Sequence, residues 1–288
     1  MQIVFHLGAH GTDDGLLIRS LLQNRARLAG EGVSVPGPMR YRELFSDIST
    51  RLRGDTADPE TEALILEAIR SRADDERVIL SNENFLCRPC MTVGSDGLYP
   101  KADKSAWLAA CLPQHTAGFA IGIRNPASYL PEIARRLSED EPLPDEILLD
   151  SLLWSDVIAD IGTANPGAEI LVWCHEDTPF IWSELMREVA GVDPYFELDG
   201  EFDMLETIIT EDGMSQLEDF LASRSLTDQI SRRRAVSAFL EDHAIEEKVV
   251  EDIEFPGWTN ETVDMLTEIY DEDVAQIAAL PQVTFVSP

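Results

Sequence analysis

The chain has 288 residues, of which 54 are Asp or Glu and 22 are Lys or Arg, so its formal net charge is −32. Its 44% of hydrophobic residues are enough to build a core, which excludes a disordered chain. A surface this acidic repels nucleic acids and anionic lipids, so neither is an expected partner, and the even spread of the acids indicates a solvated surface.

No stretch approaches the run of about 18 apolar residues that a membrane span requires. The first ten residues also lack the basic region and the apolar stretch of a signal peptide, so we expect a cytoplasmic protein. Residues 87–90 form a C-x-x-C motif, which occurs in redox pairs and in zinc sites. No second such pair and no H-x-H accompany it, so we interpret the cysteines as ordinary reduced thiols and expect no metal site.

Strands and helices alternate along the first 190 residues. The pattern predicts a buried strand at 2–7, a polar turn at 8–15 that contains glycines, and a helix from there to about 30. Further strands are predicted at 77–81, 118–123 and 169–173, and further helices at 59–73, 104–112, 128–138, 146–161 and 179–189. Such alternation predicts an α/β fold, a three-layer arrangement of one parallel sheet with helices on both faces.

From about residue 200 the pattern is helical only, with helices predicted at 203–210, 214–223, 226–242 and 260–279. We therefore expect an α/β domain at 1–200 and a helical C-terminal segment at 201–288 that packs on it. Arg232-Arg233-Arg234 is the one basic cluster of this acidic segment. Intramolecular pairing with acidic helices is the favoured interpretation, and contact with a ligand phosphate is the alternative.

Polar residues follow three of the predicted strands, at Gly8–Gly15, Ser81–Asn84 and Arg124–Ser128. The carboxyl ends of parallel strands meet at one edge of the sheet, where open α/β folds bind their ligands. We therefore expect these segments to form one site, with Arg124 facing the turn at Gly8–Gly15.

The first segment resembles the donor loop of the P-loop sulfotransferases. Bacterial members begin with a strand followed by H-I-G-x-H-K-T-G-T-T and then carry N-R-x-x-L-x-x-x-G-V-x-x-P. Here the corresponding residues run from His6 to Gly15, followed by Asn24-Arg25 to Leu28 and Gly32-Val33 to Pro36. The resemblance implies a sheet of P-loop sulfotransferase type that binds 3′-phosphoadenosine 5′-phosphosulfate (PAPS).

In that family, the loop cradles the 5′-phosphosulfate of PAPS, a role that would fall to Gly8, Ala9, His10, Gly11 and Thr12. Arg124-Asn125-Pro126 matches the element whose arginine holds the 3′-phosphate, and Ser128 belongs to the same segment. Glu83 stands where heparan-type members place the glutamate that takes the acceptor's proton. The resemblance thus implies sulfuryl transfer to a hydroxyl or amine of a small-molecule or glycan acceptor, with Glu83 and His10 as the candidate catalytic residues.

The loop departs from the family at four positions. The family's lysine is Gly11 here, and its following glycine and two threonines are Asp13, Asp14 and Gly15. A carboxylate can cap the N–H groups that would otherwise attract a phosphate. One alternative is therefore a non-catalytic binding protein of sulfotransferase fold, in which Asp13 or Asp14 accepts a hydrogen bond from the first helical turn. The others are donor binding with His10 in the lysine's role, an altered donor, and a metal ion held by the two aspartates.

Overall fold

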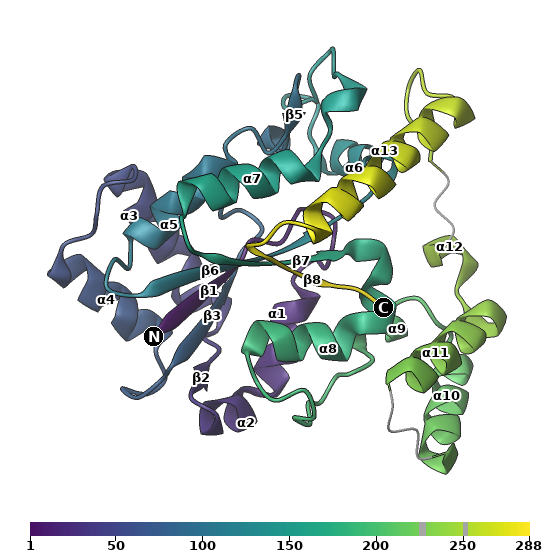
Figure 1. The fold of residues 1–288 in the computed structure, drawn as a ribbon, viewed down its shortest axis with the longest axis horizontal. Coiled ribbons are helices and arrows are strands. Elements are labelled where there is room, and N and C mark those ends of the chain that lie inside the picture. Colours follow the sequence, from purple (N-terminus) through teal and green to yellow (C-terminus); the bar gives the residue numbers. More distant parts are fainter. Residues whose placement is uncertain (225–228, 250–252) are drawn as a thin grey trace.

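A computed structural model describes residues 1–224, 229–249 and 253–288. At its centre lies a six-stranded sheet whose strands all run parallel, in the order β2-β3-β1-β6-β7-β8 (Figure 1). The strands are β1 (Gln2–His6), β2 (Val33–Ser34), β3 (Arg77–Ser81), β6 (Thr116–Ile123), β7 (Glu169–Cys174) and β8 (Val283–Val286). A small antiparallel pair, β4 (Val93–Gly94) and β5 (Gly97–Leu98), lies outside the sheet.

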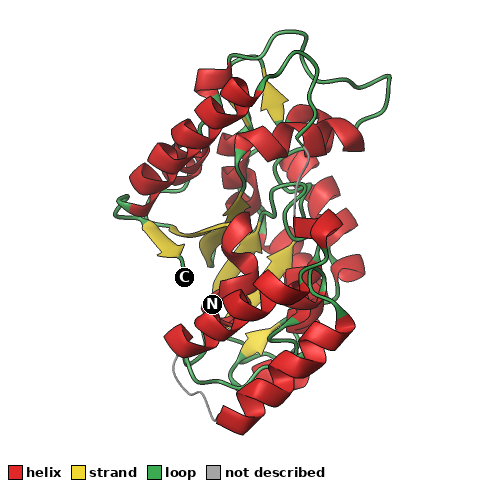
Figure 2. Cartoon of the chain, turned by 90° about the vertical axis from the view of Figure 1, so that its right-hand side faces the viewer, coloured by secondary structure: helices red, strands yellow, loops and turns green. Residues whose placement is uncertain are grey.

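Helices cover both faces of the sheet, because successive side chains of each strand point to opposite faces. Phe5 of β1 joins the core under α3 (Arg42–Leu52), α4 (Pro59–Ile69), α5 (Ser105–Ala110), α6 (Pro126–Arg136), α7 (Trp154–Ala164) and α13 (Asn260–Ala278). Its neighbour Val4 joins the core under α1 (Leu16–Gln23), α2 (Arg25–Gly30) and α8 (Thr178–Ala190). Figure 1 shows α7 and α13 on one side of the sheet and α1 and α8 on the other, and Figure 2 shows the strands stacked between helices. The predicted three-layer α/β architecture with a parallel sheet is therefore confirmed.

A third, smaller core joins α9 (Asp203–Glu206), α10 (Glu211–Arg224) and α11 (Gln229–His243), and the short α12 (Glu246–Val249) follows. Five short 3-10 helices complete the described structure, at Pro38–Arg40, Pro89–Met91, Ala102–Lys104, Leu149–Ser151 and His175–Asp177. None of the helices in the described ranges is both long and apolar enough to cross a membrane.

The C-terminal segment differs from its prediction, because it is not helical throughout. Its last element is β8, which pairs with β7 and forms one edge of the sheet. The predicted helix at 146–161 begins only at Trp154, where Asp273 of α13 caps it. The long helix predicted after residue 15 is broken at Asn24. The side-chain NH₂ of Asn24 donates to the carbonyl of Asp199, and its side-chain oxygen accepts the N–H of Asp199. Residues 226–228 of the predicted helix at 226–242 lie outside the described residues.

The helices that follow the neighbouring strands β1 and β6 lie on opposite faces of the sheet. The helix α1, which follows β1, packs in one core, and α6, which follows β6, packs in the other. In open α/β sheets this reversal marks the place where ligands bind, outside the carboxyl ends of the two strands. The segments Gly8–Gly15 and Arg124–Ser128 both begin there.

Candidate functional site

The segment Gly8–Gly15 forms a tight turn between β1 and α1. Gly8, Gly11 and Gly15 have φ angles of 51°, 74° and 74°, in the left-handed region where a side chain strains the backbone. Thr12 closes the turn, because its hydroxyl group donates to the carbonyl of Ala9 at 2.6 Å. The predicted arrangement of buried strand, glycine turn and helix is therefore present, with β1 inside the sheet and α1 beginning at Leu16.

The side chain of Asp13 caps the helix that the turn leads into. Its Oδ2 accepts a hydrogen bond of 2.9 Å from the backbone N–H of Leu17, in the first turn of α1. Only 8% of Asp13 is exposed, and its other oxygen lies 3.8 Å from Nε2 of His6. The expectation that Asp13 or Asp14 accepts a hydrogen bond from this turn is confirmed for Asp13. A carboxylate of the protein thus sits where the N-terminus of α1 would attract an anion.

His6 lies beside this carboxylate at the end of β1. The residue is 1% exposed, its Nδ1 lies 3.0 Å from the hydroxyl group of Ser81, and its ring stacks against Trp173. Burial lowers the pKa of His6, the charge of Asp13 opposes this shift, and Arg42 adds to it. His6 is therefore neutral near pH 7 and does not form a full ion pair with Asp13.

The lowered pKa of His6 predicts a loss of stability in mild acid. An unfolded histidine takes up a proton near pH 6.5, whereas the folded protein resists this, so the unfolded state binds more protons as the pH falls. For each unit by which the folded pKa lies below the unfolded pKa, the free energy of unfolding falls by about 1.4 kcal/mol once the pH is below both values. Urea denaturation at pH 7.5 and pH 5.5 should therefore show a larger loss for the wild type than for His6→Gln. Equal losses in the two proteins would contradict this role of His6.

Asp14 takes part in a separate ion network at the mouth of the loop. Its carboxylate meets Arg136 of α6 at 2.9 Å and 3.0 Å through both oxygens, and Arg136 also bonds Glu132 at 2.6 Å. A Cβ atom on Gly11 would lie 2.6 Å from Cγ of Glu132 and 3.5 Å from the Arg124 guanidinium group. The structure therefore has no room for a lysine at position 11 unless Glu132 moves.

Arg124 lies against the loop, as the sequence predicted. It is 5% exposed, its Nη1 donates to the carbonyl of Gly11 at 2.5 Å, and its Nε donates to Ser128 at 2.9 Å. Its own carbonyl accepts a hydrogen bond from the indole of Trp154. Arg124 thus braces the loop, and a phosphate that bound to its fork would have to compete with the Gly11 carbonyl.

His10, a residue of the loop, is buried, and both of its ring nitrogens have partners. Its Nδ1 lies 3.0 Å from the hydroxyl group of Tyr99, and its Nε2 lies 3.3 Å from Oδ1 of Asn84. Burial lowers the pKa of His10, and the hydrogen bond with Asn84 and the charge of Glu83 oppose that shift. A neutral ring cannot supply the positive charge of the family's lysine, which weighs against this role for His10.

Glu83 lies in the turn after β3, partly buried and near His10. Asn82 holds this turn, since its side-chain oxygen accepts the N–H of Asn84 and its carbonyl accepts the N–H of Phe85. The structure thus brings Arg124 into contact with the loop that contains His10, and it places Glu83 next in the chain to Asn84, which contacts His10. The roles of Glu83 and His10 in catalysis stay predictions.

Other predicted features have structural partners. Arg232 and Arg233 of α11 form ion pairs with Glu201 and Glu184, as the favoured interpretation of the basic cluster expected. The cysteines are free thiols, and burial raises the pKa of Cys87 to about 12, which disfavours the reactive thiolate. Within the described ranges, no group of three or more His, Cys, Asp or Glu residues is arranged to hold a metal ion.

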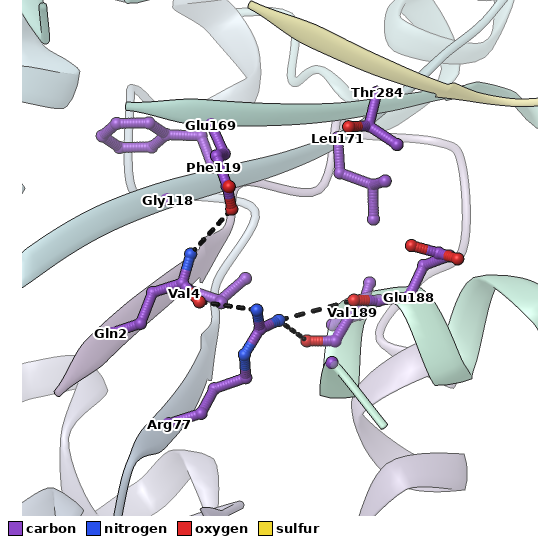
Figure 3. A pocket seen from close by; sticks show the side chains of 11 residues that line it. Gln2, Val4, Arg77, Gly118, Phe119, Glu169, Leu171, Glu188, Val189 and Thr284 are labelled. Atoms are coloured by element: carbon purple, nitrogen blue, oxygen red, sulfur yellow. Dashed lines mark hydrogen bonds between the residues drawn. The ribbon is translucent and has the colours of Figure 1, made fainter. Parts of the chain in front are cut away.

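A cavity of about 230 Å³ opens at the other, amino edge of the sheet (Figure 3). Arg77 reaches across it and donates to the carbonyl of Val189 at 2.9 Å and to the side chain of Gln2. A Cβ atom on Gly191 would lie 2.4 Å from Cζ of Arg77, so a larger residue there would displace the guanidinium group. Because protein groups already satisfy the guanidinium group, we interpret this cavity as a structural tie between α8 and the sheet.

No protein-family model matches this sequence, and no curated protein is significantly similar to it. Sequence reasoning also missed one residue of the candidate site, Arg136, whose guanidinium group holds Asp14. The only available signal was its position in the helix that follows the R-x-P element, one turn beyond Glu132.

Proposed function

We propose that this chain is a P-loop sulfotransferase-like protein that has lost sulfuryl transfer and serves as a non-catalytic ligand-binding protein. The observation that carries this proposal is the Asp13 carboxylate on the first-turn N–H of α1. A phosphate at that place would approach a buried negative charge. At 4 Å and an effective dielectric constant of 20, one such pair costs about 4 kcal/mol.

The arginines next to the loop support the same proposal. Arg136 is held by Asp14 and Glu132, and Arg124 by Gly11 and Ser128. Without a lysine at position 11, a transferring sulfuryl group would lack the cation that offsets its developing charge, and such a loss costs a large factor in rate. These residues therefore favour a closed loop over a donor site.

The experiment is calorimetric titration of the full chain with 3′,5′-adenosine bisphosphate, the stable product of the donor. We expect no saturation below about 1 mM, which corresponds to a binding free energy weaker than about −4 kcal/mol. Inorganic phosphate serves as the control for non-specific anion binding. A dissociation constant in the micromolar range for the bisphosphate would overturn the proposal.

One set of observations favours an active PAPS-dependent sulfotransferase as the second candidate function. The N–H groups of Gly8, Ala9 and Gly11 donate to no acceptor in the described part of the chain, so the loop retains donors for an anion. Glu83 also follows β3 at the same edge of the sheet, next in the chain to Asn84, which contacts His10. If the bisphosphate binds tightly, an assay of PAPS consumption with Glu83→Gln as the comparison decides this candidate.

A further inference from the structure

A second cavity, of about 160 Å³, lies beside the carboxyl end of β3 and is distinct from the loop. Its walls come from α3, from the turn after β3 and from the start of α5. Phe45, Phe85 and Trp107 supply aromatic surface, and three hydroxyl side chains of α3 and two asparagine amides supply polar groups. The volume corresponds to about five water molecules at roughly 30 Å³ each, and cavities of about this size hold a benzene-sized molecule.

The charge of this cavity is unlike that of the rest of the chain. The sequence holds 54 acidic residues among 288, yet none of the described residues that line the cavity is acidic. Its one charged group is Lys104. Glu83 stands between two lining residues, Asn82 and Asn84, but does not line the cavity itself.

Lys104 is positioned without an acidic partner. Its ammonium group lies 4.6 Å from the centre of the Trp107 ring, and it forms no ion pair with any described residue. A lysine on the face of an indole is held by a cation–π contact, and this contact leaves its N–H donors available. In a chain with a net charge of −32, a positioned cation without an ion pair to the described residues, in a lining without a carboxylate, is the feature that distinguishes this cavity.

Contacts with neighbouring side chains hold the walls of the cavity in place. Phe85 packs edge-on against Phe5 and Phe45, with ring centres 5.7 Å and 6.1 Å away. Asn84 is tied to His10 of the loop through its side-chain oxygen. Flat apolar walls with one cation and several neutral hydrogen-bonding groups match a ligand that has an apolar ring and one negative charge.

We infer that this cavity binds a small aromatic carboxylate, with the carboxylate on Lys104 and the ring between Phe45, Phe85 and Trp107. This inference rests on the cavity alone and does not require the loop at Gly8–Gly15 to bind a nucleotide. A charge-assisted hydrogen bond from lysine fixes the anionic end, and ring contacts hold the apolar end. The protein would then bind a small organic acid at a site that the sulfotransferase resemblance does not supply.

The test is calorimetric titration of the full chain with benzoate and with its neutral analogue benzamide. Benzoate should bind saturably, with a dissociation constant between about 10 µM and 1 mM, as expected for a ligand of this size. Benzamide should bind at least about tenfold more weakly, because it lacks the charge that Lys104 recognises. In Lys104→Met the preference for benzoate should vanish, whereas Lys104→Arg should keep it within a few fold.

Lys101→Met is the matched control, because Lys101 is an exposed lysine three residues away that does not line the cavity. It removes the same charge and should leave the preference unchanged. The inference is overturned if benzoate shows no saturable binding, or if Lys104→Met and Lys101→Met alter the preference equally. Circular dichroism of each variant verifies that the fold is retained, so a lost preference reports on the cavity.

Discussion

Replacing Asp13 and Asp14 together by asparagine is expected to raise the affinity for 3′,5′-adenosine bisphosphate at least tenfold. A tenfold change needs only about 1.4 kcal/mol, a fraction of the roughly 4 kcal/mol that one like-charge pair costs at 4 Å. Asparagine at position 13 can still accept the N–H of Leu17, so α1 stays capped. Asparagine at position 14 removes the ion pair with the two Nη groups of Arg136, which can then turn to a phosphate while Nε stays on Glu132.

The control for this experiment is the double variant Asp96→Asn and Asp103→Asn. Both residues are exposed, lie outside the loop and change the net charge by the same amount. Calorimetry should show the gain only for the loop variant. Equal gains in the two double variants would mean that the overall charge of the protein, and not the loop, excludes the nucleotide. No gain in either would mean that the contacts around Gly11 keep the loop closed.

Replacing Asp273 by alanine is expected to lower the free energy of unfolding by about 2–4 kcal/mol. Asp273 lies on α13 and is 5% exposed, and its carboxylate accepts the N–H groups of Trp154 and Ser155 at 2.7 Å and 3.1 Å. The alanine variant leaves two buried N–H groups unpaired, and each such group costs about 1–3 kcal/mol. The indole of Trp154 also donates to the carbonyl of Arg124, so a shift of Trp154 in the alanine variant would also disturb Arg124 beside the loop.

Urea denaturation measures this loss, and Asp273→Asn is the matched variant because it keeps an acceptor for α7. Burial raises the pKa of Asp273, so its folded form favours the proton. The wild type should therefore lose stability relative to Asp273→Asn as the pH rises from about 4 through the folded pKa. If alanine changes the unfolding free energy by less than about 0.5 kcal/mol, the start of α7 has other partners and the capping role is wrong.

The two candidate sites share one structural element, the turn after β3. Asn84 lines the cavity and also bonds His10 of the loop. The titrations with the bisphosphate and with benzoate are therefore also informative in combination. If the sites are coupled, benzoate at saturation should change the affinity of the loop variant for the bisphosphate, and the reverse change should be equal in free energy.

The sequence by itself determined the central strands of this protein and the edge of the sheet at which the candidate site lies. The strands β1, β3, β6 and β7 are short apolar runs between polar turns, a local pattern that needs no tertiary information. The cap formed by Asp13 was equally local, since it depends on a carboxylate just before a helix. The position of Arg124 beside the loop followed from the parallel arrangement, which places all carboxyl ends at one edge.

Only the tertiary structure decided the elements whose stability comes from distant partners. The strand β8 has a single buried residue, Val286, and exists because it pairs with β7. The helix α3, which the sequence did not predict, buries only Phe45 and Ile48 among polar residues. The cavity around Lys104 combines α3, the turn after β3 and the start of α5, which are remote in the chain. Its carboxylate-free lining is a property of that packing, because local patterns record which residues are apolar and not which distant surfaces meet.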